Sequence, residues 1–146
     1  MKTMKYFMLA FVLVLQSAIC EGREKVITVK ELHAAAQTLL ATHFKNHQVA
    51  LVQKDHELTH IDYDVVFNNG TKLQFDSKGE WSEIDCKPAA VPEALVPKAI
   101  SSYVKTTYTN VRIVQIERDR KGYEIELSNG LDIKFNKQFK VVEIDD

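Results

Sequence analysis

The sequence has little cysteine, no long apolar run after its first 20 residues and no excess of basic charge. Cys20 and Cys86 are its two cysteines among 146 residues, too few for a disulfide framework. The apolar run at residues 6–15 is too short to span a bilayer, and no later stretch approaches that length. The formal net charge is -1, and no basic stripe exists for nucleic acid or anionic lipid. These absences argue against a membrane-spanning or nucleic-acid-binding protein.

The amino terminus has the order of a secretory signal peptide. Two lysines precede the apolar run, and small residues near Ala18 follow it. The best fit to a small-x-small rule places cleavage after Cys20, so residues 1–20 are the predicted signal peptide. Cys20 could instead carry a lipid, but the bulky Ile19 before it favours simple cleavage. Cleavage leaves 17 basic against 20 acidic residues, a formal charge of -3. We therefore expect an exported protein, periplasmic or secreted.

Cys86 would be the single cysteine of the cleaved chain. It could not form an intramolecular disulfide, so the fold must be held by its core. We interpret Cys86 as a small packing residue near a strand end. A reactive thiol is the alternative, but no His or second Cys lies beside it in sequence.

Two segments, residues 63–85 and 123–145, carry one pattern and align without a gap. Both contain Asn-Gly, at Asn69-Gly70 and Asn129-Gly130, the pair typical of a type I′ hairpin turn. A repeat of this length indicates one supersecondary unit used twice. The repeat predicts α+β architecture: a tandem repeat of one helix plus a four-stranded antiparallel meander, with the helices packed on one face of a curved sheet.

Helical spacing precedes each set of strands. The apolar positions of the two expected helices match one another: Leu32, Ala36, Leu39, Leu40 and Phe44 in the first, and Val96, Ile100, Tyr103, Val104 and Tyr108 in the second. Thr28 and Glu31 form a capping signal for the first helix, and Pro97 stands at the start of the second. The expected strands are residues 48–54, 59–67, 72–76 and 81–84, then 111–118, 122–127, 132–136 and 141–144. Residues 85–96 are the expected linker.

Alternation along the strands predicts an apolar and a polar face of the sheet. The apolar face should carry the helices; its expected members are Tyr63, Val65, Phe67, Leu73, Phe75, Tyr123, Ile125, Leu127, Ile133 and Phe135. The polar face is expected to be open to solvent; its expected members are Asp64, Lys72, Gln74, Asp76, Glu124, Glu126, Asp132, Lys134 and Asn136. This face is the predicted contact area.

Trp81 has two interpretations. Strict alternation from Ile84 sends Trp81 to the polar face, where an exposed tryptophan would be a binding anchor. A bulge after Gly79 would instead shift the alternation and make Trp81 part of the core. Val141 holds the matching place in the second segment, so the fold does not itself require a tryptophan there.

The ordered motifs resemble the PepSY-like, β-lactamase-inhibitor-protein-like family of small exported proteins from Bacteroidetes. The residues that carry the resemblance are Asn69, Gly70, Phe75, Asp76, Gly79, Trp81, Ile84, Asp85, Val91, Pro92, Pro97, Tyr123, Asn129, Gly130 and Phe135. The resemblance implies two PepSY-like repeats, residues 21–87 and 88–146, forming one compact domain. It also implies a role in binding or inhibiting another protein, with no catalytic residues to carry over. The sequence departs from the pattern at His33, Phe139 and Val141.

No catalytic or metal motif stands out. His43 and His47 are spaced i, i+4 but lie at an expected helix end, and His56 and His60 lie in or beside a hairpin. No set of Asp, Glu or Cys completes a zinc site, and no serine has an elbow motif. We predict no catalytic residues, no metal and no cofactor, so the chain is not expected to be an enzyme.

Two function hypotheses follow. The first is an exported protein-binding module, inhibitor-like by resemblance, that uses the open sheet face to bind another envelope or extracellular protein. Its predicted binding residues are Trp81, Lys72, Gln74, Glu83, Lys134 and Glu126. The second is a periplasmic small-ligand or envelope-stress binding protein with a cleft between the repeats, lined by Tyr103, Tyr108 and Tyr123. Small sheets offer broad, shallow faces, which favours the first hypothesis.

Overall fold

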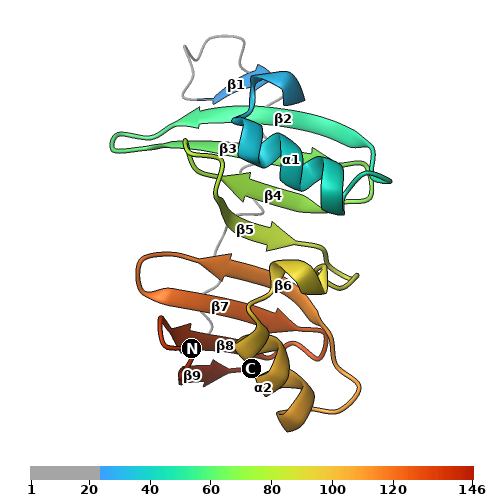
Figure 1. Cartoon of the computed structure of the whole chain (residues 1–146), viewed down its shortest axis with the longest axis vertical. Helices are drawn as coiled ribbons and strands as arrows, with labels where there is room; N and C mark the ends of the chain where they lie inside the picture. The colour runs from blue at the N-terminus through green and yellow to red at the C-terminus, as the bar shows by residue number, and fades with distance from the viewer. Residues whose placement is uncertain (1–23) are drawn as a thin grey trace.

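A computed structural model of the chain describes residues 24–146 and is α+β (Figure 1). Within these residues, nine strands form one sheet in which each strand pairs antiparallel with the next in sequence. The strands are β1 (Glu24–Ile27), β2 (Val49–His56), β3 (Ile61–Phe67), β4 (Lys72–Phe75), β5 (Trp81–Asp85), β6 (Ile113–Arg118), β7 (Gly122–Leu127), β8 (Asp132–Asn136) and β9 (Val141–Asp145). The helices are α1 (Ala34–His43) and α2 (Lys98–Thr107), with short 3-10 turns η2 (Val29–Glu31) and η3 (Glu93–Leu95). The predicted signal peptide and Cys20 lie outside the described residues.

The start of α1 differs from the prediction. Thr28 and Glu31 do form a capping box, with the Thr28 N–H donating to Glu31 Oε2 at 2.6 Å, but it caps η2. α1 begins at Ala34, where His33 Nδ1 accepts the N–H of Ala35 at 3.1 Å. β1 was not predicted, because its four residues carry no clear alternation. The strands otherwise match within about two residues at their ends, the usual scatter of strand boundaries.

The core lies between the sheet and the two helices, which cover the same side of it (Figure 1). Ala36 and Leu40 of α1 and Ile100 and Val104 of α2 are buried in one cluster with the apolar side chains of the sheet. The predicted apolar face is confirmed: the fully buried side chains of the sheet are Val65, Leu73, Phe75, Ile84, Ile116, Ile125, Leu127 and Ile133. Burying each such side chain contributes roughly 1.5–3 kcal/mol.

The sheet is continuous from β1 to β9. β5 pairs with β6 through Ile84 and Ile116, both fully buried. Below, the first half means residues 34–85 (α1 to β5), and the second half means residues 98–145 (α2 to β9).

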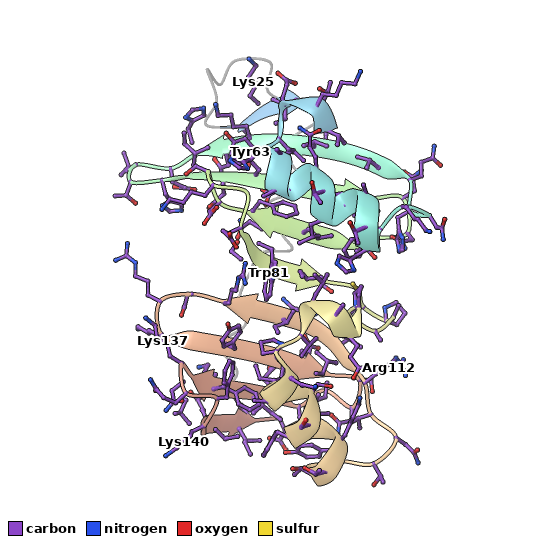
Figure 2. The ribbon with its side chains drawn as sticks, in the orientation of Figure 1. Lys25, Tyr63, Trp81, Arg112, Lys137 and Lys140 are labelled. Atoms are coloured by element: carbon purple, nitrogen blue, oxygen red, sulfur yellow. The ribbon has the colours of Figure 1, made fainter. Side chains whose placement is uncertain are left out.

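Trp81 is buried, so its interpretation as an exposed anchor is wrong. Its relative exposure is 6%. The register shifts between Gln74 and Phe75, which pairs Trp81 with Phe75 and places both on the helix side. Figure 2 shows Trp81 at the junction of β5 and β6, where the Arg118 guanidinium carbon lies 3.9 Å from its ring centroid. The register shift is a bulge in β5, as the alternative interpretation required, and this bulge is the reason that Trp81 lies in the core.

Candidate binding face of the sheet

The side of the sheet opposite the helices carries two ladders of directly paired residues that cross seven strands, β3 to β9. We call these two ladders the open face. The first ladder is Asp64, Gln74, Glu83, Glu117, Glu124, Lys134 and Glu143; the second is Val66, Lys72, Asp85, Gln115, Glu126, Asp132 and Asp145. All of them are partly or largely exposed. Paired residues share a face, and so do residues two apart on one strand. The register therefore brings both halves of the chain together in a single surface.

The open face is acidic. Nine of its fourteen members are Asp or Glu and two are Lys. In the first ladder Glu117 lies directly between Glu83 and Glu124, and in the second Asp132 lies between Glu126 and Asp145. Like charges directly opposite on neighbouring strands are destabilising. The arrangement therefore lowers the stability of the sheet while it concentrates negative potential on one side of the molecule.

Two side chains offset this repulsion where the halves meet. The amide of Gln115 donates to Glu83 Oε1 at 2.8 Å and to Glu117 Oε1 at 3.3 Å. Lys87 places its Nζ 2.8 Å from Glu126 Oε2, 3.7 Å from Asp85 Oδ2 and within 3.0 Å of Gln115 Oε1. Partial burial is the largest single influence on the pKa of Lys87 and lowers it, but the hydrogen bond to Glu126 and the charges of Asp85, Glu126 and Asp132 together raise the pKa above its ordinary value. The amino group thus stays charged and bridges the two halves.

Asp64 stands at the end of the first ladder, on β3. Burial is the main cause that raises the pKa of its carboxyl to about 6, and the neighbouring charges of Asp62, Asp55 and Glu24 contribute to the same shift. A side-chain hydrogen bond with Gln74 acts in the opposite direction. This carboxyl therefore changes charge near neutral pH.

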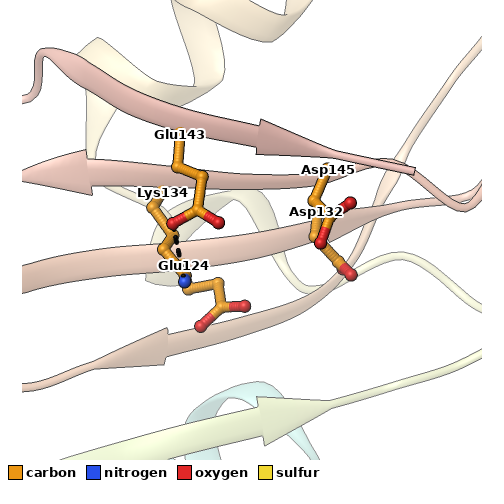
Figure 3. A pocket seen from close by; sticks show the side chains of 5 residues that line it. All are labelled: Glu124, Asp132, Lys134, Glu143 and Asp145. Atoms are coloured by element: carbon orange, nitrogen blue, oxygen red, sulfur yellow. Dashed lines mark hydrogen bonds and ion pairs between the residues drawn. The ribbon is translucent and has the colours of Figure 1, made fainter. Parts of the chain in front are cut away.

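Two shallow hollows lie on the open face. Glu124, Asp132, Lys134, Glu143 and Asp145 line the first (Figure 3), and Lys134 Nζ pairs with Glu143 Oε2 there at 2.9 Å. The second lies in the first half and is lined by Asp64, Lys72, Leu73, Gln74 and Glu83. Both are open indentations of a broad surface: charged side chains line the first, whereas the surface exposed in the second is mostly apolar despite its polar neighbours.

The structure places five of the six predicted binding residues on the open face: Lys72, Gln74, Glu83, Glu126 and Lys134. Trp81 lies on the other side. Sequence reasoning missed seven residues of this surface: Val66, Asp85, Gln115, Glu117, Glu143, Asp145 and Lys87. For Gln115 and Glu117 a signal existed, because Val114 and Ile116 are apolar and alternation along β6 would send their neighbours to the polar face. Lys87 joins the face from beyond the end of β5, where strand alternation gives no information.

The residues considered for catalysis or metal binding are dispersed. His47 packs its ring against Phe44 and Phe67, and His60 pairs with Asp62 at 3.0 Å. Among residues 24–146, no group of three His, Cys, Asp or Glu residues could hold a metal ion. Cys86 is a free, buried cysteine, and burial raises the pKa of its thiol to about 11. Its interpretation as a packing residue is confirmed.

Neither of the two hollows is the predicted aromatic cleft. Tyr103 packs edge-on against Tyr108 and Phe135, with centroids 6.3 and 5.5 Å away. Tyr123 stacks on Phe139 at 5.4 Å. All these rings belong to the second half and its turns, and none of them lines either hollow.

These features define a class: an α+β protein with two helices on one side of an open antiparallel sheet and a polar, uncovered face on the other. The comparison with known families agrees and is more specific. The profile of a family described as beta-lactamase-inhibitor-like and PepSY-like matches residues 61–143. The chain belongs to this PepSY-like family, as its motifs indicated.

Solved relatives cover nearly the whole described chain. One, from Bacteroides vulgatus ATCC 8482 and described as periplasmic and of the DUF2874 family, is 47% identical, with a TM-score of 0.83 over 84% of this chain and 97% of its own. A second, from Bacteroides thetaiotaomicron and described as calcium-regulated and periplasmic, is 41% identical, with a TM-score of 0.82 over 84% and 97%. A third, from B. vulgatus, is described as periplasmic and of unknown function, and is 40% identical, with a TM-score of 0.80 over 84% and 99%. No curated protein gives a significant match.

The relatives agree on the compartment. All three are described as periplasmic. The chain is a periplasmic protein, which confirms the localisation expected from its sequence. No helix within residues 24–146 has the length and apolar character needed to cross a membrane.

Proposed function

We propose that the chain is a non-catalytic module that binds another protein of the bacterial envelope through the open face. The observation that carries this proposal is the pair of ladders in which carboxylates face carboxylates across β5 to β9. Such pairs cost folding stability. A partner with basic side chains would relieve the repulsion on binding, so the arrangement suits a surface selected for contact rather than for stability.

The size of the face suits a protein partner. Six spacings of about 4.8 Å between seven strands give a width of about 29 Å, comparable with one side of a standard protein interface. The shallow hollows offer little enclosure for a metabolite, which is usually bound in a deep and mostly apolar pocket. The beta-lactamase-inhibitor-like description of the family is also compatible with a protein target.

We further propose that the two halves arose by duplication of one helix and four strands, and that they function as one domain. The shared sequence pattern supports this, as does the equal register of β4 with β5 and of β8 with β9. In this proposal residues 21–87 and 88–146 each contribute one half of the open face.

The test is a cross-linked capture from the envelope fraction, using protein purified from the periplasm after expression of the full chain. We compare the wild type with Glu124→Lys, in the centre of the open face, and with Glu57→Lys, the same charge change in the β2–β3 hairpin. We expect a partner that the wild type and Glu57→Lys capture equally and that Glu124→Lys captures at least tenfold less. A partner captured equally by all three would place the contact elsewhere.

Calcium is varied in the same experiment, because one relative is described as calcium-regulated. Capture that depends on calcium would make the ion a part of recognition. Absence of any specific partner, with or without calcium, would favour the small-ligand alternative.

A further inference from the structure

The edge strand β9 has the features of a strand that can pair with a further strand. β9 pairs with β8 in the same register as β5 with β4: Ile144 faces Ile133 as Ile84 faces Leu73, and both pairs of strands contain the same register shift. β5 has a second neighbour, β6. Within residues 24–146, β9 has none beyond β8.

The missing neighbour leaves apolar surface at this edge. Ile84 is 0% exposed under β6, whereas Ile144 is 51% exposed and Val142 is 63% exposed. Together with Phe139, they make up half of the exposed large apolar side chains in residues 24–146. Natural sheet edges usually carry protective charges or prolines. β9 carries the acids Glu143 and Asp145, but its exposed apolar side chains still leave a template for a strand of opposite charge.

The backbone of β9 also has donors directed away from β8. In the first half, the N–H of Cys86 donates to Val114 of β6 at 2.9 Å. Residues two apart on a strand direct their amides to the same side, so Ile84 points its N–H toward β6 as well. Ile144 holds the register of Ile84. Its N–H therefore points outward, where an added strand would accept it.

Charge selects the occupant. A second copy of β9 would pair antiparallel and keep Ile144 on the helix side of the combined sheet. In each such register an acid of one copy, Glu143 or Asp145, faces an acid of the other, which is unfavourable. A strand with basic side chains on the open side would pair with the acids of β9, and its apolar side chains on the helix side would cover Ile144.

We propose that β9 is a strand-addition site for an extended segment of a partner protein in which basic and apolar residues alternate. The basic side chains would lie beside Glu143 and Asp145, and the apolar ones would cover Ile144. Main-chain hydrogen bonds would supply affinity, and the alternating side chains specificity. This proposal concerns the edge of the sheet, and it stands whether or not the open face itself binds a protein.

The test uses two labelled synthetic peptides of the same composition and charge: one alternates lysine and valine over eight residues, and the other has four lysines followed by four valines. Fluorescence anisotropy is measured with protein purified after expression of the full chain. We expect the alternating peptide to bind at least tenfold more tightly than the block peptide. Equal binding would show only general attraction to an acidic protein and would overturn the proposal.

Two variants locate the site. Ile144→Pro removes the outward N–H at an edge position, where proline is tolerated, and Ile144→Val retains it. We expect at least tenfold weaker binding of the alternating peptide to the proline variant and less than a twofold change for the valine variant. Asp145→Lys should also weaken binding of this peptide at least threefold, whereas Glu57→Lys should not. Unchanged binding by Ile144→Pro would overturn the proposal.

Amide hydrogen exchange in the wild type keeps the test independent of how the proline variant folds. Addition of the alternating peptide should slow exchange at Ile144 and Asp146 and leave β1 unchanged. Protection at β1 or on the central strands alone would exclude β9. A dimer that Ile144→Pro dissociates would show that a second copy occupies the edge, and would overturn the choice of partner.

Discussion

The two halves of the molecule place the same elements in different surroundings. Each has a helix of ten residues and four strands in one antiparallel order. The last strand of the first half, β5, lies between β4 and β6, and the last strand of the second half, β9, lies at the edge. The contrast in exposure between Ile84 and Ile144 follows from this position alone. Burial in this protein is thus a property of the neighbours of a strand as much as of its own sequence.

The turns before these two strands are alike in their hydrogen bonds and differ in one residue. Asp76 Oδ1 accepts the N–H groups of Lys78 and Glu80, and Asn136 Oδ1 accepts those of Gln138 and Lys140. Gly79 has φ +79° in the first turn, and Phe139 has φ 61° in the second. Phe139 adopts this strained conformation while its ring stacks on Tyr123. The departure from glycine at this position therefore leaves the turn type unchanged.

The halves should differ most in the stability lost by substitutions at Trp81 and Val141, which pair with Phe75 and Phe135 in matching registers. Trp81→Ala should lower the free energy of unfolding by about 3–5 kcal/mol, because it leaves a cavity under Arg118 at the junction of β5 and β6. Val141→Ala should cost only about 1 kcal/mol, because Val141 lies on the edge strand. Urea denaturation of both variants measures the difference. Equal losses would show that the edge is as well packed as the junction.

The pH dependence of stability should also differ between the halves, because Asp64 and its counterpart Glu124 have different surroundings. It faces Gln74, whereas Glu124 in the second half faces Lys134. Burial raises the pKa of Asp64 from 3.8 to about 6, so the folded protein binds this proton more tightly than the unfolded chain. The resulting stabilisation is complete below pH 3.8 and is lost as the pH rises through about 6. It corresponds to up to about 3 kcal/mol.

Asp64→Asn should therefore increase stability at pH 7–8 and have little effect near pH 4. Glu124→Gln is the matched control, and we expect no gain at pH 7 because it removes the carboxylate opposite Lys134. Urea denaturation across this pH range checks both variants. An Asp64→Asn gain that did not depend on pH would argue against a raised pKa.

Gly79 tests the turn of the first half. A Cβ at this position would lie 2.9 Å from His33 Cβ and Nδ1, in addition to the positive φ. Gly79→Ala should cost about 2 kcal/mol or more from strain and crowding together. Gly130→Ala has positive φ with open space around the new methyl group, so it should cost about 1 kcal/mol from strain alone. Thermal denaturation distinguishes them, and equal costs would mean that His33 moves aside freely.

The smallest predicted effect concerns the junction on the open face. Gln115→Glu replaces the amide that donates to both Glu83 and Glu117 with a third carboxylate. We expect a loss of about 1 kcal/mol that diminishes in high salt. Gln138→Glu, in the exposed turn before β9, should change stability by less than about 0.5 kcal/mol. A loss for Gln115→Glu that salt did not reduce would indicate a packing effect.

Local sequence rules predicted much of this protein. Asn-Gly pairs located two hairpins, and alternation identified the buried residues of β3, β4, β7 and β8. The rules failed at two places: where one extra residue shifts the alternation of a strand, and where a cap belongs to a 3-10 turn and not to the helix. The register shift at Phe75 moved Trp81 into the core, and the cap at Thr28 belongs to a 3-10 turn before α1. The spacing of residues does not predict the register shift, because a bulge adds one residue to a strand without a fixed sequence pattern. It does not distinguish the cap of a 3-10 turn from the cap of an α-helix either.

The sequence by itself determined the local periodicity, the hairpins, the polar face of each half and membership of the PepSY-like family. These properties depend on neighbours in sequence, so they can be inferred from spacing. Only the tertiary structure decided that β5 pairs with β6, which joins two polar faces into a single acidic surface and buries Ile84 and Trp81. It also decided that β9 remains an apolar edge. Those outcomes depend on contacts between distant segments, which the same apolar and acidic residues could satisfy in more than one register.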